Sequence, residues 1–342
     1  MTKWQDLNTN PNLWKIFKTR TRLINKTRTF FDNQGFLEVQ TPLLAPYLIP
    51  ESYLEIFETK LKNKMGKETK AYLATSPEMW HKKLLAASSG NIYEITKSFR
   101  NTDIGGHFHN PEFTLLEWYR TGSDYKETMK DCQQLIRFLN NNKPLLSYQG
   151  KQLDIGKPFL QITIAQAFEK YAQVKQKDLF SLDALKIAAK KNRITVKDED
   201  IWEDIYNLLF LQTVEPNLGI EQPTIIFDFP QQFAPLAKAN PQNPKFKKRF
   251  EVYLFGIELA DAYDELTDPE LQEKEFIKEQ KLRQKLNKTP YLADKDFLEA
   301  LRKGLPDCSG VALGIDRLIM IFTDQTDINN VILFAGEEIF DL

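Results

Sequence analysis

The chain has 342 residues, of which 42% are hydrophobic, so it can bury the core of one large domain or of two ordinary ones. Its 46 Lys and Arg residues nearly balance 47 acidic residues, which excludes the basic excess of a general nucleic-acid-binding protein. Cys132 and Cys308 have no metal-ligand spacing, and no stretch has the length and hydrophobicity of a signal peptide or a membrane span. We therefore predict a cytoplasmic protein without a membrane partner.

The first third of the chain alternates helical and extended patterns. Apolar residues between 12 and 33 recur with helical spacing and predict an amphipathic helix. Residues 53–58 and 71–75 are predicted strands, separated by a lysine-rich turn over residues 60–70. Ser76-Pro77-Glu78 then opens a predicted helix that runs to Ala87. Capping of this helix explains Glu78 as well as a function does.

Residues 91–120 predict a hairpin with one apolar and one polar face. In the first arm Tyr93 and Ile95 alternate with Glu94 and Arg100, and in the second arm Leu116 and Trp118 alternate with Phe113, Glu117 and Tyr119. The connecting segment, 101–111, is rich in Asn, Asp, Gly and His, a composition typical of surface turns. The Arg, Glu and Tyr side chains that converge on one face favour a functional site instead.

A second hairpin is predicted beyond a mostly helical stretch, 145–223, and a buried strand over 223–230. It turns near Phe255-Gly256, which places Glu251 opposite Ala260 and makes Glu258 a diagonal neighbour of Glu251. Two such carboxylates repel each other, and a bound Mg²⁺ would relieve the repulsion. Two unrelated surface acids are the alternative explanation.

Three stretches resemble the signature motifs of class II aminoacyl-tRNA synthetases in the lysyl version. Residues 99–117, with Phe99-Arg100 and His109-Asn110-Pro111-Glu112-Phe113-Thr114, resemble motif 2. Residues 35–42 resemble the end of motif 1, and residues 310–318 resemble motif 3. The resemblance implies an α+β fold, with an antiparallel sheet flanked by helices over residues 1–342 and a helical insertion at 145–222. It also implies a homodimer formed through motif 1.

The resemblance implies a site that uses ATP and Mg²⁺ to activate an amino acid. The catalytic residues would be Arg100, which holds the substrate carboxylate and the α-phosphate, and Arg317, which holds the γ-phosphate. The other ATP contacts would come from Asp103, His109, Asn110 and Phe113, and Mg²⁺ would be held by Glu251 and Glu258. The amino acid would be bound by Glu78, Glu117, Tyr119, Asp261, Glu265, Ala312 and Gly314, with Glu265 facing the side-chain ammonium of lysine.

The chain departs from the lysyl pattern in three places. Thr102 stands where motif 2 has a Glu, and Asp103 is expected to take over that role. Asp261 replaces an Asn, and Ala312 replaces a Gly that lines the amino-acid pocket; one methyl group can change selectivity by roughly 1–3 kcal/mol. The anticodon-binding barrel that precedes motif 1 in bacterial lysyl-tRNA synthetases is also not found. Together these features resemble the lysyl-tRNA synthetase paralogues that ligate (R)-β-lysine onto elongation factor P.

Three hypotheses stay open on the sequence alone. The first is a protein ligase that transfers (R)-β-lysine or lysine to elongation factor P. The second is a free-standing synthetase that charges tRNA or a small acceptor, which the near-neutral charge disfavours. The third is a non-catalytic paralogue, for which Thr102 is the only argument.

Overall fold

The computed structural model describes residues 3–340, and these divide into two compact units. Of these residues, the first unit comprises 3–128, 147–150 and 265–340, and the second comprises 129–146 and 151–264. The chain passes between them within α4 (Tyr125–Leu139), within β7 (Leu145–Tyr148), after Gly150 and after β12 (Ile257–Asp264). The single domain over 1–342, whose first two and last two residues lie outside the described part, stays a prediction.

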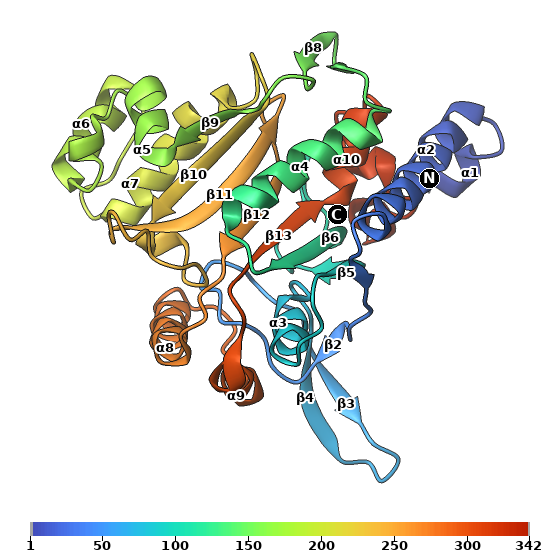
Figure 1. Ribbon diagram of the computed structural model, residues 1–342, viewed down its shortest axis with the longest axis horizontal. Helices are drawn as coiled ribbons and strands as arrows, with labels where there is room; N and C mark the ends of the chain where they lie inside the picture. The colour runs from blue at the N-terminus through green and yellow to red at the C-terminus, as the bar shows by residue number, and fades with distance from the viewer. Residues whose placement is uncertain (1–2, 341–342) are drawn as a thin grey trace. The chain divides into compact units, whose positions relative to one another are not determined.

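The main sheet of the first unit has its strands in the order β1–β5–β6–β13, and Figure 1 shows β5, β6 and β13. β1 pairs with β5 in parallel, and the other neighbours are antiparallel. The strands of this sheet are β1 (Leu37–Glu38), β5 (Ile92–Phe99), β6 (Glu112–Thr121) and β13 (Cys308–Gly314). The helices are α1 (Lys3–Asp6), α2 (Pro11–Asp32), α3 (Glu78–Ala86), α8 (Pro269–Lys285), α9 (Lys295–Gly304), α10 (Ile315–Phe322), η6 (Ile328–Val331) and α11 (Gly336–Phe340).

The predicted hairpin over residues 91–120 is confirmed as β5 and β6. Tyr93 pairs with Trp118 and Glu94 with Glu117, so one face is apolar and the other polar, as the alternation predicts. Phe31 of α2 covers the apolar face, with its ring 4.9 Å from that of Tyr93 and 5.3 Å from that of Trp118. The polar face carries the carboxylates of Glu94 and Glu117, and side chains of α3 pack against it.

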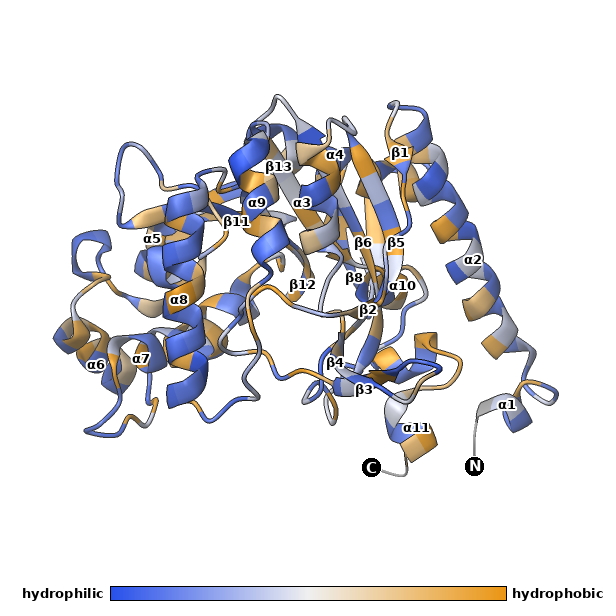
Figure 2. Cartoon of the chain, turned by 90° about the horizontal axis from the view of Figure 1, so that it is seen from below, coloured by the Kyte–Doolittle hydropathy of each residue, from blue (hydrophilic) through white to orange (hydrophobic). Residues whose placement is uncertain are grey.

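Helix α2 confirms the amphipathic helix predicted over residues 12–33. The Asn10 side chain caps its first turn, and hydrophobic and hydrophilic residues alternate along it (Figure 2). Arg20 ties the helix to the two other motifs: its guanidinium lies 2.5 Å from Asp316 of α10 and donates to Thr114 of β6 over 2.8 Å. Asp316 also accepts the Thr114 backbone N–H. The ion pair and hydrogen bonds among Arg20, Asp316 and Thr114 therefore join the helix that precedes motif 1 to motifs 2 and 3.

The strands predicted around residues 60–70 are misplaced. The lysine-rich segment is itself a ladder, β3 (Glu58–Lys62) paired with β4 (Glu68–Leu73), and only 63–67 form the turn. Lys60–Glu68 and Lys70–Glu58 ion pairs across this hairpin offset the lysine charges, which a turn prediction from composition overlooks. The short β2 (Leu44–Ala45) pairs with the inner end of β4, and the hairpin projects from the first unit (Figure 1).

The main sheet of the second unit has its strands in the order β9–β10–β11–β12. β9 and β10 are parallel, and the remaining pairs are antiparallel. The strands of the unit are β8 (Lys151–Asp154), β9 (Leu160–Thr163), β10 (Thr224–Pro230), β11 (Phe246–Leu254) and β12 (Ile257–Asp264). The helical segments are α5 (Ile164–Ala167), η1 (Phe168–Ala172), η2 (Gln176–Asp178), α6 (Leu182–Lys191), α7 (Trp202–Leu209), η3 (Phe210–Val214), η4 (Glu215–Asn217) and η5 (Gln231–Phe233).

Helical segments fill most of the stretch 145–222, as predicted, although strands occupy its first part. A stacked aromatic core joins these helices: the ring of Tyr206 lies 4.6 Å from that of Phe168 and 4.7 Å from that of Phe233. The strands β7, β8 and β9 precede them, so the segment is less purely helical than predicted. The 145–222 insertion as a unit stays a prediction.

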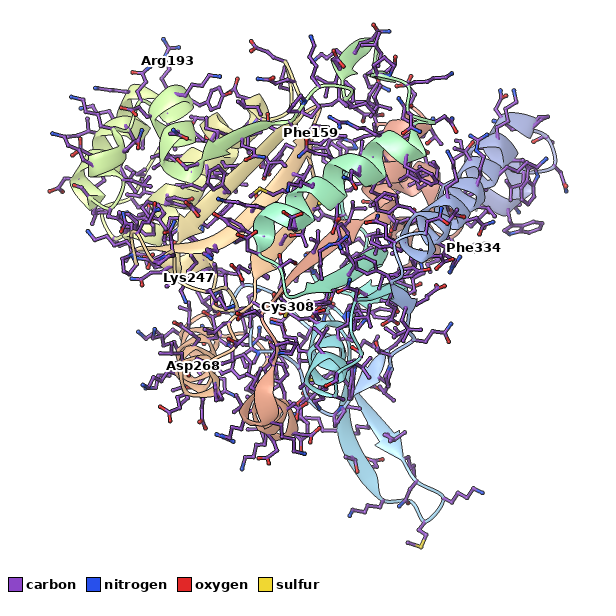
Figure 3. The ribbon with its side chains drawn as sticks, in the orientation of Figure 1. Phe159, Arg193, Lys247, Asp268, Cys308 and Phe334 are labelled. Carbon is purple, nitrogen blue, oxygen red and sulfur yellow. The ribbon has the colours of Figure 1, made fainter. Side chains whose placement is uncertain are left out.

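The predictions about membrane spans and about the two cysteines can be compared with the structure. Between residues 3 and 340, none of the helices has the length and apolar character needed to cross a membrane. Cys132 and Cys308 are both buried free thiols, and Cys308 lies at the start of β13 (Figure 3). Packing is the role that the sequence predicts for them.

Candidate active site

Strands β5, β6 and β13 place functional side chains in two rows across the polar face of the first unit. In one row Glu94 lies opposite Glu117, which in turn lies opposite Ala312 of β13. In the next row Tyr119 lies opposite Gly310. Because directly paired residues point to the same side of a sheet, these side chains share one face.

Helix α3 inserts the imidazole of His81 between the two acids of the first row. Nε2 lies 2.9 Å from Glu94 and Nδ1 lies 3.1 Å from Glu117, and the ring is completely buried. Tyr119 donates its hydroxyl to the same Glu117 oxygen over 3.0 Å. Burial alone would lower the pKa of His81, but the hydrogen bonds to both carboxylates outweigh it and raise this pKa to about 9.

The next residue of α3, Lys82, bridges a second pair of carboxylates. Its ammonium lies 2.5 Å from Glu78 and 2.6 Å from Glu265, and Lys82 and Glu265 are each 1% exposed. Oε1 of Glu265 has no hydrogen-bond donor within the described residues. Burial raises the pKa of Glu265 to about 8, although the Lys82 ammonium acts in the opposite direction. We call this group the buried carboxylate cluster: Glu78, His81, Lys82, Glu94, Glu117, Tyr119 and Glu265.

Gly310 of β13 must be a glycine because the buried carboxylate cluster leaves no space for a side chain at this position. A Cβ built at Gly310 would lie 2.3 Å from Cε1 of Tyr119 and 2.5 Å from Oε1 of Glu265. At Gly314 the nearest atom would be 3.7 Å away, which is ordinary contact. Gly310 therefore makes room for the chain's own Tyr119 and Glu265.

Four residues predicted to bind the amino acid therefore meet in one cluster: Glu78, Glu117, Tyr119 and Glu265. His81, Lys82 and Glu94 also belong to the cluster, and the sequence motifs do not indicate them. Lys82 stands four residues after Glu78 on a predicted helix, a spacing that indicates an ion pair. His81 carries no such local signal, because its partners are 13 and 36 residues away on two strands.

The residues predicted to bind ATP in the first unit form two pairs. The guanidinium of Arg100 lies over the ring of Phe113, 5.1 Å from its centroid, and the buried Nε of Arg100 has no hydrogen-bond partner in the described part of the chain. Arg317 lies in the first turn of α10, and its guanidinium lies 3.1 Å from Nε2 of His109. An unpartnered buried guanidinium nitrogen and an adjacent Arg–His pair suit phosphate oxygens.

Asn110 and Asp103 are the two other motif 2 residues that the resemblance assigns to ATP. Asn110 is buried, and its side chain is engaged by backbone: it accepts the Gly336 N–H over 2.8 Å and donates to the Glu112 carbonyl. Asp103 is half-buried and Thr102 is exposed. The ATP contacts of Asp103 and Asn110 stay predictions.

In the second unit, Glu251, Glu258 and Asp261 lie on one face of the β11–β12 hairpin with Arg249. The predicted turn is confirmed, since Phe255 and Gly256 have positive φ angles of 55° and 78°. The predicted register is wrong, because a bulge next to Val252 makes Glu251 pair with Asp261 instead of Ala260. Glu258 pairs with Tyr253, two residues from Glu251, so the two glutamates remain diagonal neighbours.

Arg249 is the cation of this hairpin cluster, which we define as Arg249, Glu251, Glu258 and Asp261. Its guanidinium lies 2.6 Å from Glu251 and 2.8 Å from Asp261, and it donates to the Phe233 carbonyl. Tyr253 donates to the second oxygen of Glu251 over 2.7 Å. Burial raises the pKa of Glu251 to about 8, with Arg249 opposing the shift and Glu258 adding to it. Repulsion between the acids is thus already relieved by the chain itself.

A metal in the hairpin cluster would depend on ligands from outside the protein. The described residues contain no group of three or more His, Cys, Asp or Glu side chains placed to hold a metal ion. Carboxylate oxygens are nevertheless the donors that Mg²⁺ accepts, and Mg²⁺ commonly uses one or two of them together with substrate phosphates. Glu251 and Glu258 fit that pattern by chemistry, and their role stays a prediction.

Comparison with known proteins agrees with these features. The model of the family "tRNA synthetases class II (D, K and N)" matches residues 2–338. A lysine–tRNA ligase of Carboxydothermus hydrogenoformans is 35% identical over 97% of this chain and 67% of its own length. Proteins named elongation factor P–(R)-β-lysine ligase are 37% identical in Haemophilus influenzae, over 92% of this chain and 93% of the relative, and 35% identical in Haemophilus ducreyi, over 93% of each. The chain belongs to the class II tRNA synthetase family, with its α+β fold of a mostly antiparallel sheet flanked by helices.

Proposed function

We propose that the protein activates (R)-β-lysine or lysine with ATP and transfers it to a lysine side chain of elongation factor P. The observation that carries the proposal is the buried Glu265 carboxylate, whose Oε1 lacks a donor in the described residues. A buried acceptor of this kind is costly unless a ligand completes it. An ammonium group would do so, and it would favour the ionised carboxylate over the protonated one.

The charge of the buried carboxylate cluster supports a substrate with two amines. Its four carboxylates, Glu78, Glu94, Glu117 and Glu265, face two cations, His81 and Lys82. With every group ionised, the cluster has two more negative than positive charges (4 − 2). A diamino acid with both amines protonated carries two positive charges and would balance it.

Activation would be a displacement at the α-phosphorus of ATP. A carboxylate oxygen of the amino acid forms a bond to that phosphorus, and the bond to pyrophosphate breaks, which gives an aminoacyl adenylate. Arg100 would hold the carboxylate and the α-phosphate, Phe113 would stack on adenine, and His109 with Arg317 would hold the γ-phosphate. Positioning and charge stabilisation supply most of the catalysis in such a step. Mg²⁺ held by Glu251 and Glu258 would add charge neutralisation at the phosphates.

Transfer would follow when the ε-amine of a lysine on the acceptor attacks the activated carbonyl carbon. An amide bond forms, AMP leaves with the bond electrons, and the amine releases a proton. Elongation factor P as acceptor and (R)-β-lysine as substrate are suggested by the names of the Haemophilus relatives. Ala312, placed opposite Glu117, supports a substrate preference different from that of lysyl-tRNA synthetases.

We also propose a homodimer formed through α2 and the end of motif 1, in the cytoplasm. Large apolar side chains are exposed in this part of the first unit, among them Trp14 of α2, Leu37 of β1 and Phe334 (Figure 3). Such exposure is typical of a surface that another protein covers. Sedimentation velocity of the wild type and of a Trp14→Glu variant tests it, and a monomeric wild type would contradict the dimer.

Amino-acid-dependent ATP–pyrophosphate exchange, run with lysine and with each β-lysine enantiomer, tests the activation step. We expect exchange that is strongest with (R)-β-lysine, and a loss of about 10²–10³-fold or more in Arg100→Ala. Arg302→Ala, which removes an exposed ion pair with Glu273, is the matched control and should keep wild-type exchange. No exchange with any of the amino acids would contradict the proposal.

The acceptor is tested separately, by mass spectrometry of elongation factor P and by tRNA charging. A lysyl-sized mass increase on elongation factor P supports the protein ligase. The Carboxydothermus relative, a lysine–tRNA ligase, motivates the second candidate. Efficient charging of tRNA without modification of elongation factor P would favour that candidate.

A further inference from the structure

The first-unit sheet places two carboxylates directly opposite each other in its interior. Glu94 and Glu117 are cross-strand partners on β5 and β6, and each is 2% exposed. Like charges in directly opposed positions destabilise a sheet, and burial increases the cost. A group that links these carboxylates is therefore needed for both to stay ionised.

His81 is that group, and it is the central member of a longer series of hydrogen-bonded side chains. Glu94 is held at its other side by Thr41, whose backbone N–H and hydroxyl donate to it over 2.9 and 2.8 Å. Beyond His81, Glu117 accepts the hydroxyl of Tyr119. The continuous order is Thr41, Glu94, His81, Glu117 and Tyr119, with every heavy-atom distance at 3.1 Å or less.

The geometry restricts Glu117 strongly. Its Oε1 receives both the Nδ1 contact of His81 and the Tyr119 hydroxyl, and the imidazole stands edge-on to the Tyr119 ring, with centroids 5.5 Å apart. Without the imidazole, nothing else described on α3 reaches Glu117 with a hydrogen bond or ion pair: the adjacent Lys82 ammonium is committed to Glu78 and Glu265. Glu117 and Tyr119 would then lose their orientation.

We propose that His81 is a positioning residue for amino-acid binding: by bridging Glu94 and Glu117 it orients the Glu117 carboxylate and the Tyr119 hydroxyl toward the substrate. The proposal rests on the proposed function for the identity of the substrate, but the bridge itself does not. His81 touches no reacting atom, so its loss should weaken substrate binding more than turnover.

The charges around His81 predict how the bridge responds to pH. The titratable groups that face it are Glu78 and Lys82 on α3, Glu94 on β5, Glu117 and Tyr119 on β6, and Glu265. The pKa of Glu94 is lowered, because its hydrogen bonds from His81 and Thr41 outweigh the effect of burial. The pKa of Glu117 is raised, chiefly by burial. Deprotonation of the imidazole above about pH 9 would remove the positive charge between the two opposed acids and leave one N–H donor for both, so the bridge would weaken there.

The test compares His81→Gln with His107→Gln in pyrophosphate exchange. His107 is exposed and pairs with Asp327, so its variant controls for loss of an imidazole. We expect His81→Gln to raise KM for the amino acid by about tenfold or more, with kcat changed by less than about threefold. In the wild type KM should rise above about pH 9, where the imidazole loses its proton, and in His81→Gln this rise should be absent. An unchanged KM in folded His81→Gln protein would overturn the proposal.

Two further measurements keep the outcome decisive. Glu94→Gln changes the side of the bridge away from Tyr119, and it should raise KM in the same direction; a wild-type KM would count against the bridge. NMR of the imidazole resonances of the wild-type protein should show one histidine that stays protonated well above pH 7 and is missing in His81→Gln. If the wild type showed no exchange, the proposed function would fail, whereas this titration would still decide whether the bridge exists. A His81 imidazole that is neutral at pH 7 would overturn it.

Discussion

Both units hold carboxylates opposite each other on antiparallel strands, and each unit supplies its own cation, but the cations differ in kind. In the second unit Arg249 joins Glu251 to Asp261. In the first unit His81 joins Glu94 to Glu117, and Lys82 joins Glu78 to Glu265. Arginine stays protonated at any pH that a protein survives, whereas histidine and buried carboxylates exchange protons near neutrality.

The difference suggests two separate tasks. A permanently charged guanidinium with three acceptors fixes a scaffold, and it leaves Glu251 with both oxygens engaged. The buried carboxylate cluster keeps an oxygen of Glu265 without a donor in the described chain, together with an excess of carboxylates over cations. The hairpin cluster is therefore held mainly by its own charges, whereas under the proposed function a cationic ligand completes the buried carboxylate cluster. The following predictions test this contrast.

The largest effect on stability is expected from Arg249→Met. The substitution leaves Glu251 and Asp261 buried or half-buried beside each other without a cation, and breaking such a pair costs about 3–5 kcal/mol. Because the Arg249 side chain is 17% exposed, we expect the lower end, about 3 kcal/mol, in urea denaturation. Arg249→Lys keeps the charge but not the fork and should lose about half as much. A loss below about 1 kcal/mol in Arg249→Met would contradict the scaffold role.

A comparable but pH-dependent effect is expected from His81. Its pKa is about 9 in the folded protein, against about 6.5 in the unfolded chain, so the folded state binds the proton more tightly. Its contribution is complete below about pH 6.5 and is lost as the pH rises through 9, by at most about 3 kcal/mol. Glu265, with a pKa raised to about 8, acts in the same direction from about pH 4.5 upward.

The free energy of unfolding, measured at several pH values, checks this prediction. The wild type should lose stability between pH 6.5 and 9, and His81→Gln should lose less of it over the same range. The Arg249 variants should keep the slope that His81 contributes, because a guanidinium releases no proton there. A His81→Gln slope equal to that of the wild type would show that the imidazole does not hold the extra proton.

The secondary structure of both clusters could be predicted from the sequence, because period-two alternation and turn residues are local signals. The β5–β6 pairing and the Phe255-Gly256 turn follow directly from them. The register of Glu251 could not be derived, because the bulge inserts Leu259 opposite no partner and no residue marks it. One extra residue moved Asp261 into the place predicted for Ala260.

The cations of the two clusters show a second kind of contact that is hard to predict from sequence. Motif resemblance pointed to Glu78, Glu117, Tyr119 and Glu265, and the structure brings them together. Arg249 and His81 were missed because each bridges acids on neighbouring strands, and sequence spacing does not indicate such contacts. Lys82 could have been inferred from its position four residues after Glu78.

A smaller loss is expected from Gly310→Ala. The new methyl group would lie 2.3 Å from the Tyr119 ring and 2.5 Å from Glu265, both buried, so the neighbours must shift at a cost of about 1–3 kcal/mol. Exchange activity should fall as well, because the shift displaces the residues that face the substrate. Gly106→Ala, where the nearest atom would be 3.8 Å away, is the control for stability. Equal stability of the two variants would contradict the tight packing.

The smallest effect, and the most specific, is expected from Ala312→Gly. Ala312 lies opposite Glu117 on the β13–β6 ladder, so its methyl group borders the carboxylate that His81 orients. Removal of the methyl group changes no charge in the cluster. We expect the ratio of kcat/KM for lysine to that for (R)-β-lysine to rise by about tenfold, since one methyl group is worth roughly 1–3 kcal/mol in such discrimination.

Pyrophosphate exchange with both amino acids measures this ratio. Ala71→Gly is the control, because it removes a buried methyl group from β4, and β4 carries no residue of the buried carboxylate cluster. If total exchange fell in Ala312→Gly while the ratio stayed constant, the methyl group would act on packing alone. A changed ratio at nearly constant stability would instead separate two functions within the same row: Glu117, held by His81, would attract the amine, and Ala312 would decide which carbon may carry it. Charge would then set whether a diamino acid binds, and shape would set which one.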